Sequence, residues 1–221
     1  MNILSMIALA VAFIAPGAMA IDLGVNNNDP ACNSGPGAPF CTISGALGLA
    51  LPGDTITVAR GTYADNIEVN TSNLSIVGIG APTLRTSGSI SRAIVTINAT
   101  GVRFEGFEVT GWTNGIIILG NNNIVSNNRV HDNGFTEIGL GLFGGEGVRV
   151  ADNLVADNSI AGGSSGIAVN GDRNTIIRNQ VTNITISAGV HVSGNKNVLR
   201  KNLVNAASST ASIYSVTTML L

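Results

Sequence analysis

Apolar and polar residues alternate over short stretches along most of this chain, and one short pattern returns at a regular interval. Each copy begins with Gly and alternate apolar residues, and an Asn-x-Val unit follows. Three copies place the Asn thirteen residues after the Gly: Gly115 to Asn128, Gly166 to Asn179 and Gly189 to Asn202. A fourth copy, beginning at Gly139, reaches Asn153 after fourteen residues. Because the Asn positions recur every 23 to 26 residues, the pattern indicates a solenoid.

The alternation has the period of a β-strand, in which successive side chains point to opposite faces. Gly, Asn or Asp ends each stretch, and these residues favour turns. Three short strands per period, stacked coil on coil, make a parallel β-helix, and parallel crossovers are almost always right-handed. The pattern therefore predicts an all-β fold, a single-stranded right-handed parallel β-helix with Val, Ile and Leu inside. We expect one bend to stack four asparagines, each followed two residues later by a buried valine: Asn128, Asn153, Asn179 and Asn202.

The first part of the chain is predicted to hold a leader and a cap. Residues 1–20 have the pattern of a secretory signal, because an apolar run too short to span a bilayer precedes an Ala-Met-Ala cleavage site. Residues 21–53 are expected to form the cap. Cys32 and Cys41 are the only cysteines, and in an exported chain they are expected to form a disulfide bond. The protein is therefore predicted to be secreted, to the periplasm or outside the cell.

The rest of the chain is predicted to be the solenoid. A short helix within residues 42–50 should cover the apolar end of the column, as the terminal units of a solenoid require. Residues 54–221 are then expected to form about seven coils. The last coil carries Ile213, Val216 and the apolar residues 219–221 with no polar cap. We therefore expect self-association or poor solubility through this C-terminal end, unless residues 217–221 fold back over it as a lid.

One segment has a more specific resemblance. Pro52-Gly-Asp-Thr-Ile-Thr-Val-x-x-Gly-Thr-Tyr63, behind a short helix flanked by cysteine, resembles the opening of secreted proteins of the pectate-lyase-like superfamily. The later Asn-x-Val units are similar to the parallel β-helix repeats of that superfamily, so the resemblance covers residues 32–216. It implies a carbohydrate-active protein. In the superfamily's pectate lyases, Ca²⁺ and a basic residue remove the C5 proton of a uronate, but the fold alone does not imply that activity.

The repeat alignment also predicts which outward side chains stack on one another. One expected column holds Ile117, Gly141, Ala168, His191 and Tyr214. His191 and Tyr214 would be neighbours on adjacent coils, and such a pair suits stacking on a sugar ring and hydrogen bonding to its hydroxyls. A second expected column holds Arg103, Ile124, Arg149, Thr175 and Val198. Arg149 is the candidate for binding a uronate carboxylate, although all three residues also fit an ordinary solvated surface.

A third expected column contains candidate metal ligands. It holds Asp132, Asp157, Asn183 and Ala206. Two carboxylates one coil apart, Asp132 and Asp157, could share Ca²⁺, which takes oxygen ligands, but Asp-Asn dipeptides also form plain turns. His131 stands beside Asp132 and is a candidate base. The sequence predicts no cofactor other than this candidate Ca²⁺.

Composition narrows the function without deciding it. Charged residues make up 11% of the 221 residues and the net charge is −2, so nucleic acid is not expected as a partner, and neither is a membrane span after the signal. The chain has no spacing typical of a Ser–His–Asp triad, a phosphate loop or a zinc site. The scarcity of acidic residues favours a non-catalytic extracellular module that binds polysaccharide or a surface partner. The alternative is a Ca²⁺-dependent lyase that cleaves a uronate polysaccharide by β-elimination.

Overall fold

The computed structural model describes residues 19–33, 35, 37–85, 93–111, 114–133, 138–143, 150–162, 165–184, 189–205 and 213–216. For residues 138–143, 150–151 and 213–216 it describes the strand backbone only.

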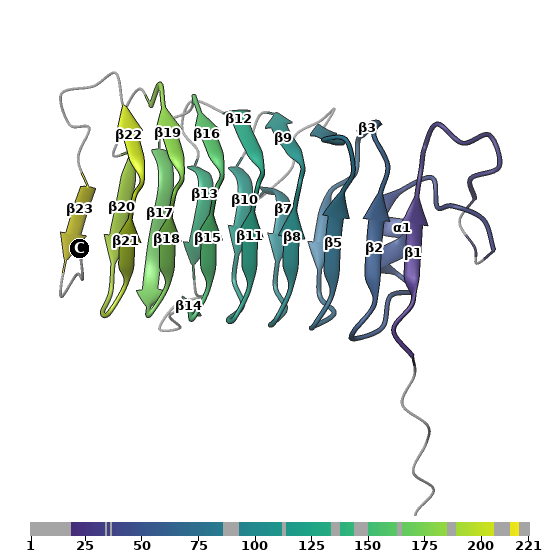
Figure 1. The fold of residues 1–221 in the computed structure, drawn as a ribbon, viewed down its shortest axis with the longest axis horizontal. Coiled ribbons are helices and arrows are strands. Elements are labelled where there is room, and N and C mark those ends of the chain that lie inside the picture. Colours follow the sequence, from purple (N-terminus) through teal and green to yellow (C-terminus); the bar gives the residue numbers. More distant parts are fainter. Residues whose placement is uncertain are drawn as a thin grey trace, which may run out of the picture.

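The described residues form seven successive coils, each with three short strands, and all neighbouring coils pair in parallel (Figure 1). Sheet A contains β1 (Asp22–Val25), β2 (Thr55–Val58), β5 (Ser75–Gly78), β8 (Arg103–Glu105), β11 (Ile124–Ser126), β15 (Leu154–Ala156), β18 (Thr175–Ile177) and β21 (Val198–Arg200). Sheet B contains β3 (Thr62–Tyr63), β6 (Thr83–Arg85), β9 (Glu108–Gly111), β12 (Arg129–Asn133), β16 (Ser159–Ala161), β19 (Gln180–Thr182) and β22 (Leu203–Asn205). Sheet C contains β4 (Ile67–Val69), β7 (Ala93–Ile97), β10 (Asn114–Ile118), β13 (Ile138–Phe143), β17 (Ser165–Asp172), β20 (Val190–Ser193) and β23 (Ile213–Val216), and β14 (Val150–Ala151) pairs with β17 beside this path. The predicted parallel β-helix is confirmed.

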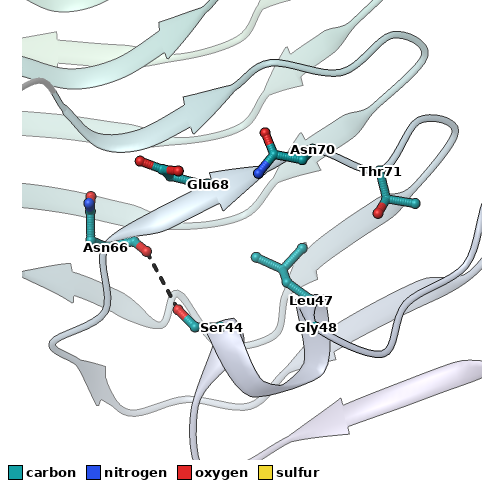
Figure 2. Close-up of a pocket in the computed structure, with 7 residues that line it drawn as sticks. All are labelled: Ser44, Leu47, Gly48, Asn66, Glu68, Asn70 and Thr71. Atoms are coloured by element: carbon teal, nitrogen blue, oxygen red, sulfur yellow. Dashed lines mark hydrogen bonds between the residues drawn. The ribbon is translucent and has the colours of Figure 1, made fainter.

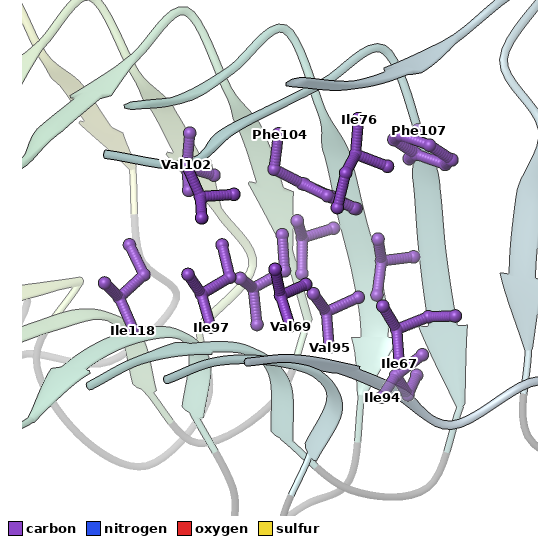
Figure 3. Packing of buried hydrophobic residues seen from close by; sticks show 14 of the residues in the cluster. Ile67, Val69, Ile76, Ile94, Val95, Ile97, Val102, Phe104, Phe107 and Ile118 are labelled. Carbon is purple, nitrogen blue, oxygen red and sulfur yellow. The ribbon is translucent and has the colours of Figure 1, made fainter. Parts of the chain in front are cut away.

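Inward-facing side chains at alternate strand positions fill the column between the three sheets. In sheet A one buried row runs through Ile56, Ile76, Phe104, Val125, Val155, Ile176 and Leu199. Figure 3 shows side chains of sheet C, such as Ile67 and Ile97, facing Phe104 and Phe107 across the column. The two phenylalanine rings stack with their centroids 4.4 Å apart. The apolar half of the alternation is therefore the core, and the polar half forms the outer faces.

Two rows of asparagine, all buried except the partly buried Asn202, join the coils at the bends. The row before sheet A holds Asn123, Asn153, Asn174 and Asn197, and the row between sheets A and B holds Asn128, Asn158, Asn179 and Asn202. The contacts repeat along each row: the Asn158 Oδ1 accepts from the backbone N–H of Asn128 at 3.1 Å, and its Nδ2 donates to the carbonyl of Val125 at 3.1 Å. The residue before each of these asparagines has a left-handed backbone, with φ between 53° and 59°. One left-handed residue followed by one inward asparagine is therefore the unit that makes both bends.

The predicted single row of four asparagines is wrong at Asn153. Asn128, Asn179 and Asn202 share a row, but Asn158 takes the fourth place and Asn153 lies in the other row. Asn158 follows Gly139 by nineteen residues, so this coil has six extra residues rather than one. The two rows are five residues apart in each coil. Asn153 of the neighbouring row therefore lies fourteen residues after Gly139, close to the thirteen residues of the other copies. Val155 is buried as predicted, but in register with Val125 of sheet A.

The cap covers the N-terminal end of the column. The helix α1 (Ile43–Leu47) forms within the predicted segment, and the Oδ2 of Asp65 accepts from the N–H of Ile43 at 2.6 Å at its start. Ile43 and Ala46 are buried against the first coil. The disulfide bond between Cys32 and Cys41 is present as predicted. Strand β1 pairs with β2 and so protects that edge of sheet A.

The two termini lie outside the described residues. The signal expected in residues 1–20 falls almost entirely within residues 1–18, and the apolar residues 219–221 follow the last described strand. Secretion and self-association through the C-terminal end therefore stay predictions. In the described part of the chain, no helix has the length and apolar character needed to cross a bilayer.

The asparagine rows predict a large loss of stability when one member is removed. Asn158→Ala deletes the acceptor for the Asn128 N–H and the donor to the Val125 carbonyl. Each buried polar group left unpaired costs about 1–3 kcal/mol. Two groups lose their partner, so we expect the free energy of unfolding to fall by about 2–6 kcal/mol in urea denaturation. Asn170→Ala, at an exposed position on β17, should change it by no more than about 0.5 kcal/mol. Equal losses in the two variants would contradict the role of the rows.

Candidate functional site

Two rows of side chains, all able to form hydrogen bonds except Ala161, line the outer face of sheet B. The strand register places Thr83, Glu108, Arg129, Ser159 and Gln180 in one row. It places Arg85, Thr110, His131, Ala161 and Thr182 in the other. Neighbouring strands lie about 4.8 Å apart, so each row presents one side chain per coil along the axis.

Four of the side chains on this face form a charged cluster, which we define as Glu108, Arg129, His131 and Asp132. The Nε2 of His131 lies 2.9 Å from the Oε1 of Glu108 and 2.7 Å from the NH1 of Arg129. Arg129 NH1 also donates to Glu108 Oε1. The Nδ1 of His131 lies 2.7 Å from the Oδ2 of Asp132. The imidazole is therefore held at both nitrogens.

A bulge in β12 brings Asp132 to its neighbour. Successive side chains of a regular strand point to opposite faces, which would separate His131 from Asp132. The register shifts between His131 and Asn133, and Asp132 has a left-handed backbone with φ of 52°. Aspartate is among the residues that tolerate this conformation. The shift turns the Asp132 carboxylate towards the ring, where it can hold Nδ1–H as a donor.

The positions in the cluster differ in their access to solvent. The side chain of His131 is 13% exposed, whereas that of Arg129 is 60% exposed. The contacts of Arg129 within the described residues use NH1, so the other guanidinium donors face outward. A neutral imidazole with its hydrogen on Nδ1 can accept from Arg129 at Nε2, and a protonated one can donate to Glu108. The cluster thus offers an exposed cation beside a shielded acid–base group.

The cluster also lowers the pKa of Glu108. The main cause is the hydrogen bond with His131, and the Thr83 hydroxyl adds to it by donating to Oε2 at 2.9 Å. Partial burial opposes the shift and Arg129 supports it. Glu108 is therefore held as a carboxylate, which keeps negative charge between the imidazole and the guanidinium.

The predicted calcium pair is wrong. Asp132 lies within β12 of sheet B, whereas Asp157 follows β15 of sheet A, so the two carboxylates do not share a column. Arg178 binds Asp157 through two hydrogen bonds of 2.6 and 2.7 Å, and this contact lowers the Asp157 pKa. The cause is the misplaced coil, because Asn158 and not Asn153 aligns with Asn128. Among the described residues, no group of three or more His, Cys, Asp or Glu side chains could hold a metal ion.

The predicted sugar-binding residues have a mixed outcome. The register pairs His191 with Tyr214 and continues the column through Ala168, Gly141 and Ile117, as the spacing predicts. The His191 side chain is exposed, and that of Tyr214 lies outside the description. Arg149 lies outside the described residues, and Leu154 fills the place predicted for it between Ile124 and Thr175. A sugar-binding role for these residues stays a prediction.

Sequence reasoning identified His131 and missed its two main partners. Glu108 follows Phe107, and Arg129 follows Asn128, at equivalent points of adjacent coils. The repeat therefore contained the signal, since aligning the first residue after each bend puts Glu108 and Arg129 in one row. The column considered from the sequence in this region began three residues later, at Asp132, and His131 was named only as its neighbour.

Comparison with known proteins supports the fold. A family model described as "Right handed beta helix region" matches residues 60–219. Pectate lyase Pel9A matches with a TM-score of 0.63 and 17% identity over 92% of this chain, which spans 62% of the length of that enzyme. At that identity the match shows the fold alone. An alginate lyase from Paenibacillus sp. str. FPU-7 aligns with 14% identity over 80% of this chain and 95% of its own, but its TM-score of 0.25 carries no argument. Comparison with curated protein sequences finds no match.

The lowered pKa of Glu108 predicts a pH-dependent contribution to stability. A carboxylate whose pKa is lowered by folding stabilises the protein above its unfolded value, near 4.5, and loses that contribution as pH falls through the folded value. Glu108→Gln should therefore lower the free energy of unfolding at pH 7 by about 1 kcal/mol or less. The difference between variant and wild type should shrink as the pH falls below 4.5. A difference that stays constant in urea denaturation across this range would contradict the prediction, and Glu68→Gln on sheet C serves as the control.

Proposed function

We propose a function from the premise that this chain belongs to the right-handed β-helix family: it is a secreted, non-catalytic module that binds an acidic polysaccharide along the outer face of sheet B. The observation that carries the proposal is the exposed guanidinium of Arg129 in the middle of that face, with donors left over from its contacts to Glu108 and His131.

Arginine suits a uronate because of its shape. The planar guanidinium presents two parallel N–H groups that match the two oxygens of a carboxylate. Glu108 and His131 engage NH1 from one side, so they hold the side chain in place. This arrangement reduces the side-chain entropy that is lost when a ligand binds.

The rows on either side of the cluster suit the rest of a sugar chain. Thr83 and Thr110 lie before Arg129 and His131 along the axis, and Ser159, Gln180 and Thr182 lie after them. Their hydroxyl and amide groups can both donate to and accept from sugar hydroxyls. The rise of about 4.8 Å per coil is close to the length of one pyranose unit. A polysaccharide along the axis would therefore meet a new pair of side chains at each sugar.

A second contact surface is proposed on sheet C. His191 is exposed there, and its backbone partner is Tyr214 on the next coil. An imidazole and a phenol ring suit stacking on a sugar ring. This pair lies in the last two described coils, away from the charged cluster.

The second candidate function is a uronate lyase with His131 as the base. The observation that favours it is the Asp132 carboxylate at Nδ1, which would hold the hydrogen there and leave a lone pair on Nε2. Nε2 would take the C5 proton, the electron pair of the C5–H bond would form a C4=C5 double bond, and the C4–O bond would break. The leaving oxygen would take up a proton from water, with Arg129 on the uronate carboxylate. However, Glu108 and Arg129 both lie within 3 Å of Nε2, and the side chain is only 13% exposed. Binding is therefore the function that this geometry supports better.

Substitution of Arg129 tests the binding proposal. Arg129→Ala should weaken binding to polygalacturonate or alginate by about 10- to 100-fold, because a hydrogen bond to a charged group contributes about 1.5–3 kcal/mol. Affinity electrophoresis and calorimetry at one fixed salt concentration would measure it. Arg103→Ala is the matched control, since Arg103 is an exposed, ion-paired arginine on sheet A, and it should bind like the wild type. Equal losses in both variants, or a loss only in His191→Ala, would contradict binding on sheet B.

An elimination assay separates the two functions. Polygalacturonate and alginate are incubated with the protein, with and without Ca²⁺, and the ultraviolet absorbance of unsaturated uronide is followed. We expect no increase over the buffer rate. An increase that His131→Ala abolishes would overturn the non-catalytic proposal and support the lyase.

A further inference from the structure

A pocket of about 330 Å³ lies at the N-terminal end of sheet C, between α1 and β4 (Figure 2). Leu47 and Gly48 line it from the helix side. Glu68, Asn70 and Thr71 line it from the strand side. It lies on a different face from the charged cluster of sheet B.

The strand alternation creates one wall of this pocket. Ile67 and Val69 point inward and are fully buried, so Glu68 and Asn70 point outward. In the described residues β4 is the end strand of sheet C, with β7 as its only neighbour in the sheet. The helix α1 lies beyond the free edge, and its Ser44 hydroxyl donates to the carbonyl of Asn66 at 3.5 Å. The hollow is therefore fixed between the cap and the first coil.

The polar groups of the pocket have defined hydrogen-bonding roles. The Oδ1 of Asn70 accepts from the Nδ2 of Asn98 at 2.8 Å, so the Asn70 amide has its N–H groups left to donate. The Glu68 carboxylate is exposed, and the described part of the chain shows no hydrogen bond or ion pair to it. Leu47 is partly buried against the core and presents an apolar surface beside them. Donor, acceptor and apolar surface meet within one small site.

We infer that this pocket binds one neutral pyranose residue, with Glu68 accepting from two sugar hydroxyls, the Asn70 amide donating to a third and Leu47 packing on the C–H face of the ring. Sugar hydroxyls both donate and accept, so they match this mixture. An ammonium ligand could donate to Glu68, but it has no acceptor for the N–H groups of Asn70. A uronate would bring its carboxylate to Glu68, and no lysine or arginine is among the described lining residues.

Nuclear magnetic resonance titration tests the inference directly. The wild-type protein is titrated with methyl glucoside, galactoside, mannoside and galacturonoside, and with neutral disaccharides of the first three sugars. At least one neutral glycoside should bind with a millimolar dissociation constant and shift the backbone amides of Leu47, Glu68 and Asn70, and the galacturonoside should shift the same amides with at least tenfold weaker affinity. Disaccharides that bind better than the monosaccharide would identify a glycan as the ligand, and equal binding would identify the free sugar.

Two substitutions probe the polar groups without changing their size. Glu68→Gln removes the charge, and Asn70→Asp keeps the acceptor for Asn98 while removing the donor. Each should weaken binding of the neutral glycoside by about tenfold. Arg129→Ala should leave it unchanged, so the result is independent of acidic-polymer binding. The inference is overturned if no neutral glycoside shifts these amides in the wild type, if the galacturonoside shifts them with equal affinity, or if both substituted proteins keep the wild-type affinity.

Discussion

The structure depends on pairing the backbone polar groups at the bends between the sheets. Strand hydrogen bonds stop at each bend, and every buried N–H or C=O group left unpaired costs about 1–3 kcal/mol. The asparagine rows remove this cost, because an amide such as that of Asn158 accepts from an N–H of one coil and donates to a carbonyl of the same coil. The left-handed residue before each asparagine adds strain, of about 1–2 kcal/mol for a residue such as Arg178. Its ion pair with Asp157, the left-handed residue one coil earlier, offsets part of that strain.

The sequence predicted the architecture and failed on one coil for a physical reason. Alternation recurs along the chain and the thirteen-residue spacing holds in three of the four aligned copies, so the parallel β-helix followed from them. The need to cover the end of such a column predicted the helical cap. The two asparagine rows are chemically alike and five residues apart, so Asn153 and Asn158 could not be told apart by residue type. The strand register and the hydrogen bonds from Asn123 to Asn153 and from Asn128 to Asn158 distinguish them. Aligning Asn153 with Asn128 placed Asp157 in the same predicted column as Asp132. The structure places these two carboxylates in different columns.

The candidate site was harder to predict because its residues depend on an irregularity. His131 and Asp132 meet through the bulge of β12, and no spacing rule predicts a bulge.

Comparison of two exposed arginines separates a structural from a functional role. Arg178 binds Asp157 through both of its facing nitrogens, which completes the pair, whereas Arg129 makes its contacts through NH1 and leaves its other donors free. The ion pair of Arg178 stabilises a bend between coils. The contacts of Arg129 contribute little to a bend, and its unused donors on a rigid face are available to a ligand.

The two proposed sites have opposite character and a fixed relation. Glu68 makes the pocket at the cap suited to neutral groups, whereas Arg129 makes the face of sheet B suited to acidic ones. Strand β4 belongs to the first described coil and β12 to the fourth, so at about 4.8 Å per coil the sites are about 14 Å apart along the axis, on adjacent faces. A linear polymer that follows the axis on sheet B passes the pocket on the other side of the bend between sheets B and C. Simultaneous binding therefore requires either a bend in the polymer or a neutral branch on an acidic backbone, so the rigid column would select for polymer architecture as well as for charge.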